Sequence, residues 1–384
     1  MKSLVYVGMD VHKATYSLCC FVPSAGDFLG ETKIDADAKL VKAYLKEIAE
    51  LLSSKGFSDV GFVTGYEAGC LGFSLYKELT KLGIECRIIA PTTLSVEACI
   101  AKKKSDRKDA RMLARNLAYG SCKFVHIPDD VDLETKEYIR MRADHVVALK
   151  KVKQQINALC LRLGEEYGEG AKWTQKHLDW LKHLELPGLV KEALDEYLDT
   201  YEKAVEKLDR LNGKIAERAE MERYKEVTDR FSCLKGVTKQ GALTVVAEIG
   251  DFSRFETPNE LCSYLGLVPG ENSSGERESR LGITKLGNGV VRTQLVESAQ
   301  AIVRGSPGRK SKKTSSKQAG MPARVISYCD RATERMMRKF RRLLGRNVAY
   351  NKAVVAVARE LACFLWGLAN DRLDGRPVPA RKTA

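Results

Sequence analysis

The chain has 384 residues, of which 44% are hydrophobic, and its formal net charge is +14. This length accommodates two or three domains with sizeable cores, so the fold needs neither disulfides nor a structural metal. The 11 cysteines show no Cys-x-x-Cys pair, and no apolar stretch reaches the roughly 18 residues of a membrane span, which argues against zinc sites and membrane insertion. Because the N-terminal run lacks a cleavage-site pattern, we expect a cytoplasmic protein.

The basic residues are clustered at residues 102–115, 304–324 and 335–346. Clustering of positive charge is typical of proteins that bind a polyanion, most often nucleic acid. A solvated basic face explains any one cluster equally well. Three clusters in one chain favour a nucleic-acid partner.

The first third of the chain alternates strand-like and helix-like runs. Short β-branched and apolar runs predict strands at 4–10, 15–23, 27–35, 59–67 and 84–91. Helical periodicity appears at 38–52 and 72–83, and a further helix carries the basic stretch within 101–120. The order βββαβαβα predicts an α/β domain over residues 1–125.

The middle of the chain, residues 126–225, has a different period. Apolar residues from Leu149 to Leu163, and again from Leu194 to Ile215, alternate three- and four-residue steps, with Asn212 in a core position. This heptad rhythm predicts a long helical hairpin or a dimerising coiled coil, while two ordinary core helices fit as well.

Residues 226–384 are predicted to form a mostly α-helical third domain. It contains a Gly/Ser loop before a helix that starts near Asn288, a basic arm at 304–324, and a closing apolar helix at 350–369. The arm has no acidic residue between Glu297 and Asp330, so we expect it to be mobile.

Four acidic residues could meet at one edge of the predicted sheet. Asp10 ends the first strand and Glu67 ends the fourth, and these strands are neighbours in a βββαβαβ sheet. Asp106 and Asp109 share one face of the following helix. Four facing carboxylates repel one another unless a cation neutralises them, and oxygen-only ligation suits Mg²⁺. Two such ions about 4 Å apart can clamp a phosphodiester, although acids in a basic helix are more often intrahelical ion pairs.

The loop "ENSSGERESRLGITKLGNGVVR" places Ser273 and Ser274 among basic residues. A serine can attack a phosphodiester where cations stabilise the developing charge, but Ser-Ser-Gly loops are usually plain turns. His12, beside Asp10, is read as a solvated turn histidine rather than a phosphate contact.

Six motifs occur in this order along the chain: "VGMDVHK", "YEAGC", "KKSDRKDARMLAR", "LKGVTKQGALTVVAEIGDFSRF", "LCSYLGLVPGENSSGER" and "RLGITKLGNGVVRTQL". With them the chain resembles the transposases of the insertion sequence 110 family, also called DEDD transposases. The resemblance implies an RNase H-like domain similar to Holliday-junction resolvases, a coiled-coil linker and a C-terminal transposase domain. It also implies that Asp10, Glu67, Asp106 and Asp109 bind Mg²⁺ and that Ser274 is the nucleophile, with Ser273 as the second choice.

The resemblance further implies donor and target DNA, a structured non-coding bridge RNA and a homo-oligomer, a dimer or a tetramer, as partners. We expect nucleoid association during activity. The nucleic-acid contacts predicted from the basic clusters are Lys102, Lys103, Lys104, Arg107, Lys108, Arg277, Arg280, Lys285, Arg292, Arg309, Lys310, Lys312 and Lys313.

Two other functions remain open at this point. A junction-cleaving nuclease would use the same metal site with water as nucleophile and would leave Ser274 a structural role. A non-catalytic nucleic-acid-binding protein would use the acidic residues only in ion pairs.

Overall fold

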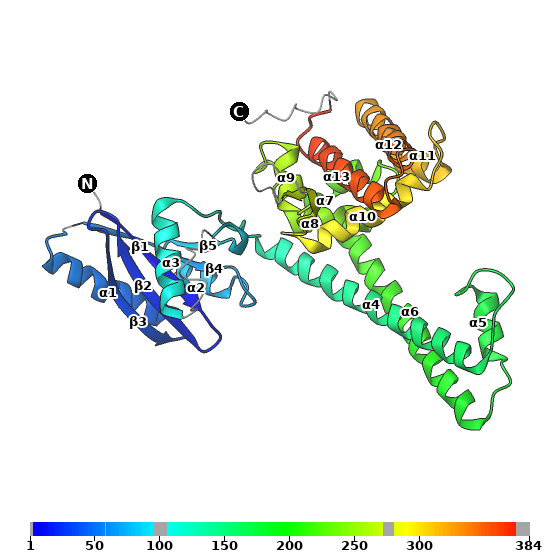
Figure 1. Ribbon diagram of the computed structural model, residues 1–384, viewed down its shortest axis with the longest axis horizontal. Coiled ribbons are helices and arrows are strands. Elements are labelled where there is room, and N and C mark those ends of the chain that lie inside the picture. Colours follow the sequence, from blue (N-terminus) through cyan, green and yellow to red (C-terminus); the bar gives the residue numbers. More distant parts are fainter. Residues whose placement is uncertain (1–2, 58, 95–105, 272–279, 374–384) are drawn as a thin grey trace. The chain divides into compact units, whose positions relative to one another are not determined.

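The computed structural model describes residues 3–57, 59–94, 106–271 and 280–373 of the chain. Contacts divide the chain into two compact units, Met1–Ile127 and Pro128–Ala384. The described part of the first unit is a mixed α/β sheet domain, and that of the second is helical except for one short hairpin (Figure 1). This arrangement confirms the expected α/β region followed by helices. The helices of residues 126–225 belong to the same unit as the C-terminal helices.

The first unit contains a five-stranded sheet in the order β3-β2-β1-β4-β5. Its strands are β1 Ser3–Val11, β2 Thr15–Val22, β3 Asp27–Asp35, β4 Val60–Glu67 and β5 Cys86–Ile89. The first three strands form an antiparallel meander, and β4 and β5 continue the sheet in parallel with β1. The predicted neighbourhood of the first and fourth strands is therefore confirmed.

Helices cover both faces of this sheet. Helices α1 (Ala38–Ser54) and α2 (Ser74–Lys81) pack on the face that carries Val5, Val7 and Met9. Helix α3 (Asp106–Tyr119) packs on the opposite face, over β1, β2 and β4. Since side chains alternate along a strand, the even-numbered residues of β1 face α3.

Two glycines allow α3 to approach the sheet closely. Gly8 and Gly65 are paired across β1 and β4. A Cβ atom on Gly8 would lie 2.1 Å from the carbonyl oxygen of Ala110, and one on Gly65 would lie 2.8 Å from Cδ1 of Leu117. At these two positions α3 packs directly against the backbone of β1 and β4, because neither strand has a side chain there.

Replacing Gly8 by alanine is expected to destabilise the first unit by about 3 kcal/mol, because the added methyl group overlaps helix backbone that cannot move without displacing α3. Urea unfolding followed by circular dichroism measures this loss. Gly69→Ala is the control, since its nearest neighbour would lie 4.0 Å away and no strain is expected. Equal midpoints for the two variants would show that α3 is not held in close contact with the sheet.

The second unit begins with a long helical hairpin. Helices α4 (Asp130–Leu163) and α6 (Gly188–Ala219) pack against each other, and α5 (Gln175–Lys182) lies between them in sequence. The predicted apolar seam is buried at Val152, Ile156 and Leu159, among other positions. Asn212 accepts a 3.0 Å hydrogen bond from Arg142, so this polar residue pairs the two helices. The hairpin alternative of the sequence analysis is thus present within one chain.

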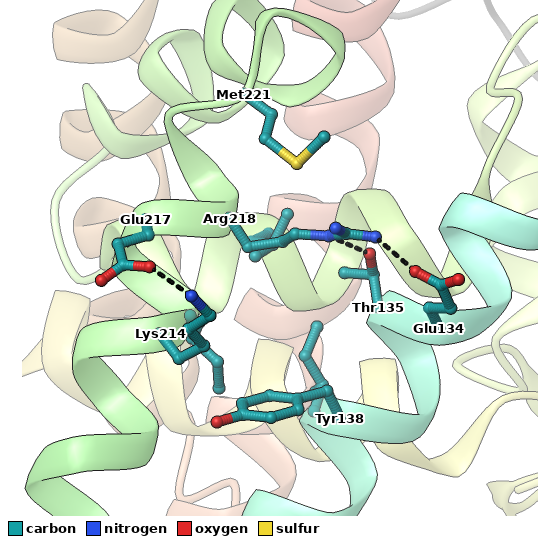
Figure 2. A pocket seen from close by; sticks show the side chains of 10 residues that line it. Glu134, Thr135, Tyr138, Lys214, Glu217, Arg218 and Met221 are labelled. Atoms are coloured by element: carbon teal, nitrogen blue, oxygen red, sulfur yellow. Dashed lines mark hydrogen bonds and ion pairs between the residues drawn. The ribbon is translucent and has the colours of Figure 1, made fainter.

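A hollow of about 340 Å³ lies where α4 and α6 meet α8. Figure 2 shows that the charged side chains around it are paired with one another. Arg218 donates hydrogen bonds to Thr135 at 2.9 Å and to Glu134 at 3.3 Å, and Lys214 pairs with Glu217 at 2.7 Å. These bonds brace the base of the hairpin, and we assign the hollow a structural role.

The remaining elements form one helical core. They are α7 Glu222–Ser232, α8 Lys239–Ile249, α9 Pro258–Tyr264, β6 Pro269–Glu271, β7 Arg280–Ile283, α10 Gly289–Val303, α11 Lys312–Gln318, α12 Ala323–Leu344 and α13 Tyr350–Ala369. Helices α8 and α13 are buried along most of their length, as their apolar sequences require. Thr238 caps α8 by accepting a 3.0 Å hydrogen bond from the amide of Gly241. None of the helices in the described ranges is both long and apolar enough for a membrane span.

The predicted mobile basic arm at 304–324 is wrong. The segment contains α11 and is fixed to the helical core, with Gln318 buried. The Gln318 amide donates to the carbonyl of Cys233 at 3.0 Å and to Asp330 at 3.1 Å, and Lys310 pairs with Asp330 at 2.5 Å. The acidic partner lies just beyond the acid-free stretch, in α12, and composition alone could not show that the fold brings it back.

Candidate metal centre at the edge of the sheet

Asp10 and Glu67 occupy equivalent places on neighbouring parallel strands. The register pairs Gly8 with Gly65 and Met9 with Tyr66, so Asp10 and Glu67 follow at the same level. Each acid lies two residues after its glycine and therefore points to the same face of the sheet as that glycine. This is the face on which α3 rests. The side chain of Asp10 is 20% exposed, whereas Glu67 is an exposed residue at the strand end.

Helix α3 supplies the other two predicted acids from its first turn. Asp106 is its first residue, and Asp109 lies one turn further on the same side. Ala110, Leu113 and Leu117 are buried against the sheet and fix the helix in position. Carboxylates are favourable in a first helical turn because the free backbone amides there carry partial positive charge.

Three side chains at this edge lie close enough to share a metal ion. Among the described residues, ligand atoms of Asp10, His12 and Asp106 all lie within 4.8 Å of one another. His12 Nε2 lies 3.2 Å from Asp10 Oδ2 and 4.0 Å from Asp106 Oδ1. Lys33 of β3 also pairs with Asp106, at 3.1 Å. Asp10 and Asp106, which are 96 positions apart in the chain, therefore meet.

The surroundings of Asp10 and Asp106 shift the pKa values of the two carboxyls in opposite directions. Burial raises the pKa of the Asp10 carboxyl, and the charges of Asp109 and Asp106 raise it further, while His12 opposes them. Asp109 and Glu67 do not belong to the described group of side chains whose ligand atoms lie within 4.8 Å of one another. Asp106 behaves in the opposite way, because the hydrogen bond and charge of Lys33 hold the pKa of Asp106 below its usual value.

The sequence did not predict Lys33 at this edge, and His12, expected only in a solvated turn, contacts Asp10 and Asp106. His12 lies two residues after Asp10, so strand alternation could have placed it on the same face. Lys33 depends on register, since Asp10 pairs with Ser17 and Ser17 pairs with Lys33 across three strands. No feature of the sequence fixes that register.

The predicted nucleic-acid contacts have different surroundings. Arg107, Lys108, Lys285, Arg309, Lys312 and Lys313 are exposed. Arg292 instead donates to the carbonyls of Leu265 at 3.0 Å and Leu286 at 3.5 Å, which gives it a structural role. Arg280 is the first residue of β7. The candidates that lie outside the described residues are Lys102, Lys103, Lys104, Ser273, Ser274 and Arg277.

The strands on either side of the serine-containing segment are anchored to the helical core. Gly266 and Gly287 have positive φ angles of 63° and 82° and pack backbone to backbone, since a Cβ on Gly287 would lie 1.8 Å from the carbonyl oxygen of Tyr264. Next to them, Asn288 caps α10 and donates a 2.8 Å hydrogen bond to Glu248.

Glu248 connects this hairpin to the long helix α4. Its side chain is 1% exposed and accepts two hydrogen bonds from Arg140, at 2.8 and 3.1 Å. A buried carboxylate requires such charged partners because its desolvation is costly. The base of the β6–β7 hairpin is therefore tied to both α4 and α10.

Comparison with known proteins gives the family of this chain. A family model described as transposase, with the labels DEDD and IS110, matches residues 7–163. A second model, described as the transposase IS116/IS110/IS902 family, matches residues 228–314. A putative transposase, y4qE of Sinorhizobium fredii, is 33% identical over 368 residues, which cover 95% of this chain and 88% of the relative. The chain belongs to the IS110 family of transposases.

Two further relatives extend the match. The transposase for insertion sequence element IS1533 of Leptospira borgpetersenii is 27% identical, with 89% of this chain and 97% of the relative covered. The transposase for insertion sequence element IS1111A of Coxiella burnetii is 25% identical, with 82% of each chain covered. As an IS110-family transposase, the protein belongs to a class of enzymes that bind, cleave and rejoin DNA.

Proposed function

We propose that this transposase cuts DNA at a metal site formed by Asp10, Glu67, Asp106 and Asp109, and that Ser274 becomes linked to the cut strand. The observation that carries the proposal is the meeting of Asp10 and Asp106 at one sheet edge, with the charge of Asp109 acting on Asp10. The family match supports DNA as the substrate.

The residues at the edge fit a hard divalent cation such as Mg²⁺. Asp10 and Asp106 would hold it with carboxylate oxygens, and Asp109 and Glu67 lie on the same face to complete the set. Burial raises the pKa of the Asp10 carboxyl, and the charges of Asp109 and Asp106 raise it further against the opposing effect of His12, so a cation at this edge would stabilise the ionised form. When bound, the ion polarises a phosphodiester oxygen and stabilises the charge that develops there.

Two features of the first unit support an RNase H-like fold. Its sheet begins with an antiparallel meander and continues through parallel strands on the side of β1, in the order β3-β2-β1-β4-β5. Its acidic residues lie at the ends of the central strands β1 and β4 and on the helix that crosses them.

The proposed serine step conserves the energy of the bond that is broken. The Ser274 oxygen attacks phosphorus and forms a serine–phosphate ester, while the bond to the 3′-oxygen breaks. The serine loses its proton, and the 3′-oxygen takes one up and leaves as a hydroxyl. Because the ester retains the energy, a 3′-hydroxyl can later reverse the step and rejoin DNA without ATP. Gly266, Gly287 and Asn288, which flank β6 and β7, are held against the helical core.

RNA guidance is part of the same proposal. Base pairing with a bridge RNA would select the donor and target DNA, so the protein would need mainly backbone contacts from its exposed basic residues. The helical hairpin of α4 and α6 offers long surfaces through which copies could pair as a coiled coil. We place this activity at the nucleoid of the cytoplasm.

The alternative of a junction nuclease with a water nucleophile rests on the same carboxylates. A nuclease of this kind needs no serine. The acidic residues at the sheet edge are sufficient for it, because a bound metal ion can activate water.

Metal binding tests the proposal at its base. In a titration with Mn²⁺ followed by electron paramagnetic resonance, Asp106→Asn is expected to weaken binding at least tenfold relative to wild type. Asp27→Asn, at the end of β3 opposite to Lys33, is the matched control and should bind normally. If the two variants bind Mn²⁺ equally, the acids serve only in ion pairs, as in a non-catalytic nucleic-acid-binding protein.

A further inference from the structure

Helix α12 carries a stripe of arginines along its exposed face. Arg331, Arg335, Arg338 and Arg342 are separated by four, three and four residues and are all exposed. This spacing places them on one side of the helix, with neighbours about 5 to 6 Å apart. The opposite side, which includes Cys329, Met336 and Phe340, is buried in the helical core. The stripe is therefore held on a rigid element.

The stripe lines two adjoining hollows. One, of about 580 Å³, lies over Arg335, Arg338, Lys339 and Arg342. The other, of about 510 Å³, includes Arg309 and Lys310 of the segment 304–324, and the two hollows share Arg331 and Glu334. Together they form a groove, which we call the α12 groove, lined by eight cationic and three acidic side chains.

Some basic side chains of the α12 groove pair with acidic residues, and others have no acidic partner among the described residues. Glu360 of α13, whose side chain is 8% exposed, pairs with Arg335 and with Lys339, so it fixes two of them. Arg338 pairs with the exposed Glu334 at 2.5 Å, a contact that an anion can replace. Arg331 donates a 3.3 Å hydrogen bond to the carbonyl of Leu373, and neither Arg331 nor Arg342 forms an ion pair with any residue in the described ranges. A polyanion would meet cations that the protein itself leaves uncompensated.

We propose that the α12 groove binds the phosphate backbone of duplex DNA. This inference takes DNA as the partner from the proposed function and does not depend on the metal site or on Ser274. Single-strand sites combine basic residues with aromatic platforms for stacking, and none of the described residues that line this groove is aromatic. Regularly spaced arginines on a rigid helix match a backbone whose charges are regularly spaced. The groove contacts DNA without reading its sequence.

The test compares two triple variants of the full chain. Arg331→Gln, Arg338→Gln and Arg342→Gln remove three cations of the groove and leave both partners of Glu360 in place. Lys150→Gln, Lys151→Gln and Lys207→Gln remove the same charge from exposed positions on the helical hairpin. Circular dichroism and thermal unfolding establish that both variants fold.

Fluorescence anisotropy with a labelled DNA duplex, over a range of salt concentrations, gives the dissociation constant and its salt dependence. The groove variant is expected to bind at least about tenfold more weakly, and its salt slope should fall by about 2 to 3. The hairpin variant should change neither value comparably. Equal effects of the two variants would overturn the proposal, as would a loss confined to single-stranded DNA or to duplex RNA.

This result is independent of the serine chemistry. If the groove variant binds the duplex as tightly as wild type while DNA still becomes linked to Ser274, the groove is wrong and the proposed function stands. If the groove variant loses affinity and wild type never forms a covalent link, the groove stands and the serine step is wrong.

Discussion

Replacing Asp10 by asparagine is expected to reduce DNA cleavage at least about a thousandfold, because a carboxylate that helps to hold the catalytic cation contributes several kcal/mol to the transition state. The asparagine keeps the size of the side chain and removes its charge. Burial and the charges of Asp109 and Asp106 together outweigh the favourable effect of His12 on the Asp10 carboxylate, so the substitution should not weaken the metal-free fold. In a chelator, its melting temperature should equal or exceed that of wild type.

Cleavage of an end-labelled duplex in Mg²⁺ and thermal unfolding in a chelator measure the two effects. Asp27→Asn, at the exposed start of β3, is the control and should behave as wild type in both. A large fall in melting temperature for Asp10→Asn would mean that the carboxylate is a structural ion-pair partner. Normal cleavage by this variant would remove Asp10 from the catalytic site.

Replacing Ser274 by alanine is expected to abolish the covalent protein–DNA product while leaving metal binding intact. The serine oxygen is the atom that would bond to phosphorus, and alanine offers no nucleophile in its place. The adjacent Ser273→Ala tests the assignment, since it removes the same group one residue away. Mass spectrometry of peptides from a protein–DNA reaction identifies the modified residue.

The two serine variants give distinct outcomes. If only Ser273→Ala loses the product, the nucleophile is the neighbouring serine. If both variants cut DNA and wild type shows no nucleotide-bearing peptide, water is the nucleophile and the enzyme is a metal-dependent nuclease.

The sequence predicts the sheet well because local pattern and topology agree there. The β-branched runs, the neighbourhood of β1 and β4, and the helix that carries Asp106 all follow from it. The pairing of Gly8 with Gly65 gives the physical reason for the placement of the acids. Each glycine lets α3 pack closely against its strand, and the acidic residue two positions later points to the same face of the sheet.

The positions of His12 and Lys33 could not be predicted in the same way. Their contacts with Asp106 depend on strand register and on the position of α3, which are set by packing between distant segments. Such contacts change with a shift of a single residue in register. The sequence therefore identifies the acidic residues that are candidate metal ligands, but it does not identify the basic residues that contact them.

The segment 304–324 illustrates a second limit. Its many lysines and serines are typical of a solvated arm, yet Gln318 is buried and Lys310 reaches Asp330. The composition of a segment shows only the charges within that segment, whereas folding brings it against acidic residues of other helices such as Asp330. Within the described residues, the same pairing leaves Arg331 and Arg342 of the α12 groove without an acidic partner, and the basic cluster at 335–346 includes only the second of them.

A denaturing gel of end-labelled DNA distinguishes a serine-linked intermediate from cleavage by water. Wild type, Ser274→Ala and Asp109→Ala would be incubated with the DNA, with Mg²⁺, and with or without the RNA that flanks the gene. Our account predicts a protein-linked DNA band that requires Ser274, Asp109 and the RNA. Free cut ends that persist in Ser274→Ala and vanish in Asp109→Ala would contradict it.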